Sequence, residues 1–395
     1  MDFLKSQNCI CLHRSILTTN TFKPAIVKLM KPYSKIITVI GYIVTLASLA
    51  FLYSYKKITA TSSVASTTEN QNNAKENFDQ KETTATSSNP LSIAYMRQQN
   101  YLGSNIKIEQ TLASGNNYNQ YIASYLSDNF KIYGLLTIPQ GLPPTNGWPI
   151  IIFNHGYIRP DTYNTTKHYE LYIQAFASDG YIVFKPDFRG NGNSEGVPDS
   201  TYFSPNYTVD VLNAFASLKK YSGVNPNKIG MWGHSDGGNV ILRSIVVNTK
   251  DIKAAVIWGG VVAPYSDLTT DWQKRVTYQQ TAADQSLENN HMQDLITEYG
   301  TPANNPNFWN SIDPNNFLSD ITTPIQLDVG GSDEEVPIDF SVTLSDTLSA
   351  LGKKVEYNNY PGLNHNISLK NIPSDTAPFS TAMQNTITFF DRYLK

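Results

Sequence analysis

The chain has 395 residues, 40% of them apolar and 16% charged, with a net charge of −3. This composition excludes a disordered chain and a multispan membrane protein, and the length allows one large α/β domain with additions. Residues 1–57 carry a charge of +7, so residues 58–395 carry −10. A body of that sign has no electrostatic reason to bind nucleic acid, and we expect no nucleic-acid partner.

Residues 36–55 form an uncharged apolar run that predicts a transmembrane helix. At about 1.5 Å per residue, such a run spans a hydrocarbon core of roughly 30 Å. Six basic residues lie in segment 1–35 and two follow the run, which predicts that segment 1–35 stays in the cytoplasm. We therefore expect a membrane anchor with the rest of the chain extracytoplasmic.

The fate of this run has two alternatives. It is longer than the apolar core of roughly 7–15 residues in a cleaved signal peptide, which favours a retained anchor. Translation from Met30 would instead give it a short basic leader, and Ser63 to Ala65 would offer small residues for cleavage. The protein would then be secreted.

Residues 56–92 are rich in Ser, Thr and Asn, a composition typical of a flexible linker. Organised apolar patterning begins near Ile93, so the folded domain is assigned to residues 93–395. Both cysteines, Cys9 and Cys11, precede this domain, which therefore holds no disulfide, cysteine nucleophile or thiolate metal site.

The domain begins with β-prone runs at 106–110, 118–127 and 130–139, which predict two or three antiparallel strands. Six apolar runs follow, and amphipathic helical patterns lie between most of them. This alternation predicts a doubly wound, mainly parallel sheet of the α/β class. The apolar runs are 149–153, 181–185, 229–232, 254–258, 325–329 and 354–357, and the clearest helical patterns are 168–178, 209–221, 239–247 and 381–394.

Residues 264–323 interrupt the alternation. The segment contains several aromatic residues, including Trp272 and Trp309, but no strand pattern. Because it is too long for a simple connection, we expect a helical insertion that forms a lid.

The segment Gly233-His234-Ser235-Asp236-Gly237 carries the strongest chemical signal. It is a G-x-S-x-G motif between a strand pattern and a helix pattern, the context of a nucleophile elbow. In such an elbow the serine occupies a strained turn, and side chains at the two glycines would collide with the neighbouring strand and helix. The N–H of Asp236 would lie at a helix start, where it can stabilise an oxyanion.

A serine hydroxyl is a poor nucleophile and needs an oriented base. In this arrangement an acid and a histidine should follow at the ends of later strands. The run 325–329 leads into a loop with Asp333, and the run 354–357 leads into a loop with His365. We predict that Ser235 is the nucleophile, His365 the base and Asp333 the acid that orients it.

Rival acids and histidines fit this pattern less well. Asp328 lies inside its strand, and Glu334 and Glu335 are expected to be solvated neighbours of the acid. His168 and His291 fall in helical or lid sequence, and no histidine has the spacing of metal ligands. We expect no metal and no cofactor.

Two loops after earlier strands also have predicted roles. The loop Asn154-His155-Gly156-Tyr157 should supply the second oxyanion donor, from the N–H of Tyr157 or alternatively its phenol. The segment 187–196 contains glycines but has a glutamate where a dinucleotide fingerprint needs its third glycine. We interpret it as a structural loop in which Arg189 pairs locally.

The segments YGLLTIP, NHGY, DFRGNGNSEG, GHSDGG, GGSDEEVP and PGLNHN occur in this order over residues 120–395. As a set they resemble the α/β-hydrolase superfamily and, more narrowly, the catalytic domain of the prolyl oligopeptidase family of serine peptidases. The resemblance implies a serine hydrolase that forms an acyl-enzyme. Esterases and acyl-thioesterases share most of these motifs.

The chain also departs from the pattern of that family. Its peptidases usually carry a β-propeller before the catalytic domain, and residues 93–121 are too few to form one. No acidic motif for gripping a free N-terminus is assignable, so the lid would supply selectivity. We expect an exported, membrane-anchored serine hydrolase for a small peptide or ester. Peptidase activity is favoured, and carboxylesterase or acyl-thioesterase activity is the alternative. A catalytically inactive binding protein is the third hypothesis. The sequence leaves the oligomeric state open.

Overall fold

The computed structural model describes residues 88–199, 201–270, 272, 282–368 and 380–395. The predicted transmembrane run 36–55, the segment 1–35 and nearly all of the predicted linker lie outside these ranges. No helix within the described ranges has both the length and the apolar character needed to cross a bilayer.

Within the described residues, nine strands form one sheet in the order β1-β2-β3-β5-β4-β6-β7-β8-β9. The pairs from β1 to β3 and from β3 to β5 are antiparallel, and every pair from β5 through β4 to β9 is parallel. The predicted antiparallel lead-in and mainly parallel sheet are confirmed. The strands are β1 Lys107–Thr111, β2 Tyr118–Ser127, β3 Phe130–Pro139, β4 Trp148–Asn154, β5 Ile182–Pro186, β6 Val224–His234, β7 Ala255–Trp258, β8 Ile325–Gly330 and β9 Val355–Tyr360.

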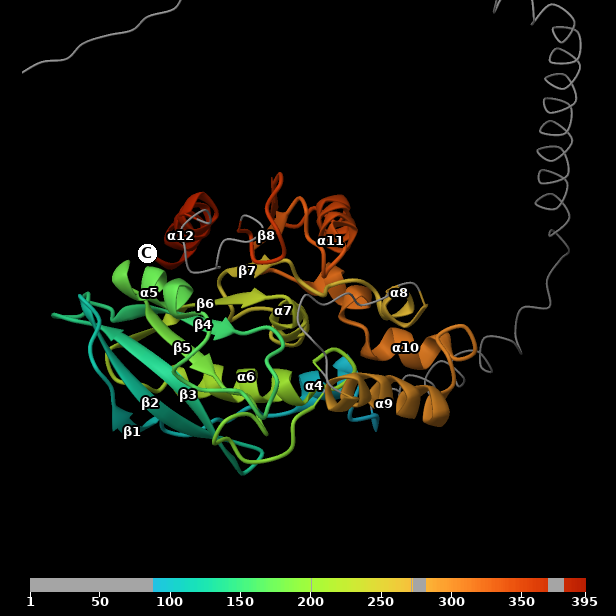
Figure 1. Ribbon diagram of the computed structural model, residues 1–395, viewed down its shortest axis with the longest axis horizontal. Coiled ribbons are helices and arrows are strands. Elements are labelled where there is room, and N and C mark those ends of the chain that lie inside the picture. The colour runs from blue at the N-terminus through green and yellow to red at the C-terminus, as the bar shows by residue number, and fades with distance from the viewer. Residues whose placement is uncertain (1–87, 200, 271, 273–281, 369–379) are drawn as a thin grey trace, which may run out of the picture. The chain divides into compact units, whose positions relative to one another are not determined.

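Helices cover both faces of this sheet, which explains why its strands have continuous apolar sequences (Figure 1). Helices α5 (Glu170–Ser178) and α12 (Ser380–Leu394) pack through aromatic residues such as Phe176 and Phe390 on one face. The other face carries the larger apolar core, and four helices pack against it. They are α4 Ile93–Gln98, α6 Asn206–Leu218, α7 Asp236–Val247 and α11 Ile338–Ala350.

The described part of residues 264–323 is helical and contains no strand. Its helices lie together at one end of the sheet, at the right of Figure 1. Trp309 is buried within an aromatic cluster and donates its indole N–H to the Gly300 carbonyl at 2.9 Å, so it holds the insertion together. That the insertion works as a lid stays a prediction. Its elements are α8 Tyr265–Thr270, α9 Ala282–Tyr299, α10 Pro306–Ile312 and the 3₁₀ helix η1 Pro314–Asp320.

The loop after β5 corrects one prediction. Arg189 does not pair locally: its guanidinium lies 2.7 Å from a carboxylate oxygen of Asp210 on α6 and 2.9 Å from one of Asp128 in the β2–β3 turn. The fold brings these elements to the same sheet edge, because β3 pairs with β5. The cation is nearly buried and ties the end of β5 to α6, so the loop is structural, as expected.

Candidate active site

Ser235 lies at the turn between β6 and α7, at the carboxyl edge of the sheet. Its φ of 54° and ψ of −122° are a conformation that residues with a side chain rarely adopt. Besides the bond from the Gly238 N–H within the turn, two backbone bonds tie Ser235 to the neighbouring segment: the Ser235 N–H donates to the Trp258 carbonyl at 2.9 Å, and the Val261 N–H donates to the Ser235 carbonyl at 3.1 Å. The end of β7 and the segment after it therefore fix the turn.

The glycines on either side of Ser235 have the steric role that the sequence predicts. A Cβ on Gly237 would lie 2.1 Å from the Asn154 carbonyl oxygen at the end of β4. A Cβ on Gly233 would lie 2.7 Å from the Gly237 carbonyl oxygen. Neither backbone can yield, so the strand-to-helix turn needs glycine at both positions.

The loops after β8 and β9 bring Asp333 and His365 together. His365 Nδ1 lies 2.8 Å from Asp333 Oδ2, and both side chains are almost fully buried. The other oxygen of Asp333 accepts the backbone N–H groups of Glu335 and Val336, each at 2.9 Å. The carboxylate is thus oriented from both sides, and His365 Nδ1 carries the proton that it donates, which leaves Nε2 as the basic nitrogen.

The electrostatic surroundings of His365 favour its protonated form. Burial alone would lower the pKa of His365, but the hydrogen bond and charge of Asp333 outweigh it, with help from the charges of Glu335 and Asp236. The pKa of His365 is therefore raised above the ordinary value of 6.5. A histidine in this state is a stronger base than a free imidazole.

Gly259 lets this acid–base pair lie close to the backbone that holds Ser235. It directly follows Trp258, whose carbonyl holds the serine turn, and has a φ of 50°. A Cβ on Gly259 would lie 3.1 Å from His365 Nδ1 and 3.2 Å from Asp333 Oδ2. Gly259 is not among the predicted site residues, although a Gly-Gly pair directly after a buried strand signals close backbone approach.

The rival carboxylates lie elsewhere or have different contacts. Asp328 is buried on β8, and its carboxylate accepts hydrogen bonds from the Asn358 amide at 2.7 Å and the Thr386 hydroxyl at 3.3 Å. Thr386 belongs to α12, so Asp328 faces that helix rather than His365. Glu334 is exposed, as expected, but it also accepts the His365 N–H at 3.4 Å, a contact that the sequence did not predict.

The two predicted oxyanion groups flank Ser235. Asp236 is the first residue of α7, and N–H groups in the first turn of a helix have no acceptor within the helix. Tyr157 follows Gly156, at which a Cβ would lie 3.1 Å from Ser235 Cβ. The loop after β4 therefore packs directly against the serine, and donation from Tyr157 and Asp236 stays a prediction.

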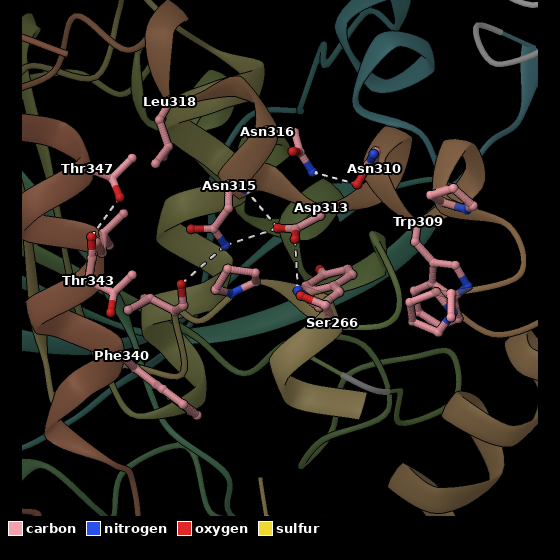
Figure 2. Close-up of a pocket in the computed structure, with 17 residues that line it drawn as sticks. Ser266, Trp309, Asn310, Asp313, Asn315, Asn316, Leu318, Phe340, Thr343 and Thr347 are labelled. Carbon is pink, nitrogen blue, oxygen red and sulfur yellow. Dashed lines mark hydrogen bonds between the residues drawn. The ribbon is translucent and has the colours of Figure 1, made fainter. Parts of the chain in front are cut away.

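A separate cavity of about 530 Å³ lies between the insertion and α11. Figure 2 shows Phe340, Thr343 and Thr347 of α11 on one side and Trp309 on the other, with Asn315 between them. None of Ser235, Asp333 and His365 lines this cavity. Bond cleavage by those residues would therefore take place outside it.

The described residues contain no group of three His, Cys, Asp or Glu side chains arranged to hold a metal ion. His168 is exposed just before α5, and His291 on α9 contacts Asp199 at 3.0 Å. Ser235 and the hydrogen-bonded pair of His365 and Asp333 lie in loops at the carboxyl edge of one sheet, an arrangement that suits acyl transfer.

Residues 167–395, more than half of the chain, match the prolyl oligopeptidase family. The chain belongs to this family. Among curated relatives, the uncharacterized peptidase YtmA of Bacillus subtilis is 28% identical over 62% of this chain and 85% of its own length. Dipeptidyl-aminopeptidase B of Aspergillus niger is 25% identical, and the match spans 62% of this chain but only a quarter of that protein.

Solved structures share the α/β-hydrolase fold. The acylaminoacyl peptidase of Pyrococcus horikoshii has a TM-score of 0.55 at 20% identity, over 71% of this chain and 42% of its own. An acetyl xylan esterase from Paenibacillus sp. R4 has a TM-score of 0.56 at 17% identity, over 76% and 92%. The family match and the relatives named as peptidases together identify this member of the prolyl oligopeptidase family as a serine hydrolase.

Proposed function

We propose that this serine hydrolase cleaves peptide bonds through an acyl-enzyme on Ser235, with His365 as base and Asp333 as its orienting acid. The observation that carries the proposal is the 2.8 Å hydrogen bond between buried His365 and Asp333, next to the backbone that holds Ser235. The strained backbone of Ser235 supports it, because such strain persists only where the surrounding structure enforces it.

In the proposed reaction, Ser235 Oγ attacks the substrate carbonyl while His365 Nε2 takes the hydroxyl proton. The N–H groups of Asp236 and Tyr157 stabilise the oxyanion of the tetrahedral intermediate. His365 returns the proton to the leaving amine as the carbon–nitrogen bond breaks and the acyl-enzyme forms. Water, deprotonated by His365, then attacks the ester of Ser235, and the acid leaves with Ser235 protonated again. Throughout, Asp333 accepts the hydrogen bond from Nδ1–H of His365, which keeps that proton on the imidazole, and its charge stabilises the imidazolium.

Peptidase activity is favoured because the family is a peptidase family and the first relatives are named as peptidases. Carboxylesterase activity is the alternative, since a solved structure with this fold is an acetyl xylan esterase and an alkoxide is a better leaving group than an amine. Acyl-thioester cleavage would use the same steps. In each case we propose that residues 264–323 select the substrate.

Matched substrates separate these alternatives. One acyl group is presented as a p-nitrophenyl ester and as a p-nitroanilide to the full chain in detergent. A peptidase should cleave the anilide with a kcat/KM within about a hundredfold of the ester, because His365 can protonate the poor amine leaving group. Ester cleavage without anilide turnover would identify an esterase. Ser235→Ala should cleave neither substrate, and activity that persists in this variant would refute the proposed mechanism.

The pH profile tests the role of His365. Because a protonated imidazole cannot accept the serine proton, kcat/KM should fall as the pH drops through the pKa of His365, with a midpoint above 6.5 for an uncharged substrate. In Asp333→Asn the stabilising charge is lost, so the midpoint should move to lower pH and kcat should fall by about 10⁴. A wild-type midpoint below 6.5, or one that Asp333→Asn leaves unchanged, would contradict the assignment.

We further propose that residues 36–55 anchor the protein and that residues 93–395 work outside the cytoplasm. The support is the uncharged run and the excess of basic residues before it. The full chain should resist extraction of membranes by alkaline carbonate, and deletion of residues 1–57 should release it. Release of the full chain by carbonate would contradict anchoring, and recovery of a shortened chain from the medium would favour cleavage.

A further inference from the structure

The hydroxyl of Tyr169 bridges two of the loops that surround Ser235. Its oxygen accepts the backbone N–H of Gly156, in the loop after β4, at 3.0 Å. The same hydroxyl lies 2.9 Å from Nδ1 of His234, the residue immediately before Ser235. Tyr169 is the last residue of the long loop after β4, thirteen positions beyond Gly156 and directly before the first residue of α5. It therefore joins the predicted oxyanion loop to the nucleophile elbow.

The proton positions in this bridge follow from its partners. His234 Nε2 lies 3.1 Å from the His365 carbonyl, which can only accept, so Nε2 carries the proton. Burial and the neighbouring His365 lower the pKa of His234 to about 3, so the ring is neutral and its Nδ1 accepts. Tyr169 must then donate to Nδ1. These hydrogen bonds form one chain, from the Gly156 N–H through Tyr169 and His234 to the His365 carbonyl.

The carbonyl of Gly156 is held as firmly as its N–H. His155 Nδ1 lies 2.7 Å from that oxygen and therefore donates to it. Burial lowers the pKa of His155 to about 3, so this neutral tautomer persists across the working pH range. In a trans peptide the C=O and the following N–H point in opposite directions. The bond from His155 therefore also sets the direction of the Tyr157 N–H, the predicted oxyanion donor.

Backbone strain marks the same position. Tyr169 has a φ of 58° and His168 a φ of 64°, both in the left-handed region that residues with a side chain seldom occupy. The ring of Tyr169 is fixed by edge contacts with Phe153 at 5.3 Å and Tyr172 at 5.5 Å between ring centroids. A strained backbone with a clamped ring places the hydroxyl at one point.

From this geometry we propose that Tyr169, acting with His234, is a positioning residue that holds the oxyanion loop in register with Ser235 and His365. The inference rests on the proposed function, because it assumes that Ser235 is attacked in an oxyanion site beside Tyr157. Tyr169 does not touch the reacting atoms. It keeps the donor aimed at the place where negative charge develops, so a misplaced donor loses stabilisation of the transition state while substrate binding changes little.

The matched variants are Tyr169→Phe and Tyr181→Phe, each of which removes one hydroxyl and keeps its ring. Tyr181 is fully buried and bonds Asp391 at 2.6 Å, with no part in the site. In the full chain, Tyr169→Phe should lower kcat by about ten- to a hundredfold with KM within about twofold, because orientation is lost rather than binding. Tyr181→Phe should keep the wild-type kcat.

A thionoester of the same acyl group distinguishes positioning from a structural role. Sulfur accepts hydrogen bonds more weakly than oxygen, so an intact oxyanion site favours the ester over the thionoester. Tyr169→Phe should reduce this preference, and Tyr181→Phe should not. An equal loss on both substrates, or a kcat within about twofold of the Tyr181→Phe control, would overturn the inference.

Two further variants keep the test decisive. If Tyr169→Phe does not fold, His234→Gln can replace it, since a glutamine can still donate to the His365 carbonyl but offers Tyr169 no acceptor at the position of Nδ1. His234→Gln should also reduce the preference for the ester over the thionoester, and an unchanged preference would overturn the inference. Ser235→Ala tests the proposed function separately from the role of Tyr169. The proposed function requires that this variant has no activity, whatever the result for Tyr169→Phe.

Discussion

The site depends on how closely the main chain of several loops can approach Ser235. At the carboxyl edge of the sheet, a Cβ on Gly237 would meet the Asn154 carbonyl at 2.1 Å, and one on Gly330 would meet the Asn364 carbonyl at 2.0 Å. Such distances are shorter than any real contact, so β8 can lie against the His365 loop only without a side chain. The glycines are thus what allows the main chain of these loops to approach as closely as the proposed mechanism requires.

Much of this site could be predicted from sequence because its residues follow strands. In a parallel sheet the carboxyl ends of the strands share one edge, so loops after β6, β8 and β9 must lie near one another. Once the strands are recognised, this constraint predicts that Ser235, Asp333 and His365 share one sheet edge, and the structure joins His365 to Asp333 there at 2.8 Å. The same reasoning set aside Asp328, since a residue within a strand points to a sheet face, and in the structure its carboxylate contacts Thr386 of α12.

The contacts that could not be predicted join residues that lie far apart in the sequence, where no local pattern indicates that they meet. Arg189 finds Asp128 and Asp210 because β3 and α6 happen to flank its loop. Tyr169 meets His234 across 65 residues, and no local pattern marks either of them. Side-chain hydrogen bonds of this kind depend on strand order and helix placement together, which the alternation of apolar runs leaves undetermined.

Labelling with a fluorophosphonate tests the central claim most directly, because the reagent phosphonylates a serine only where a base and an oxyanion site activate it. The full chain in detergent is labelled, digested, and mapped by tandem mass spectrometry, alongside His365→Ala. The account predicts a single adduct on Ser235 that forms far more slowly in His365→Ala. An adduct on another serine, or none on a folded chain that hydrolyses ester, would contradict it.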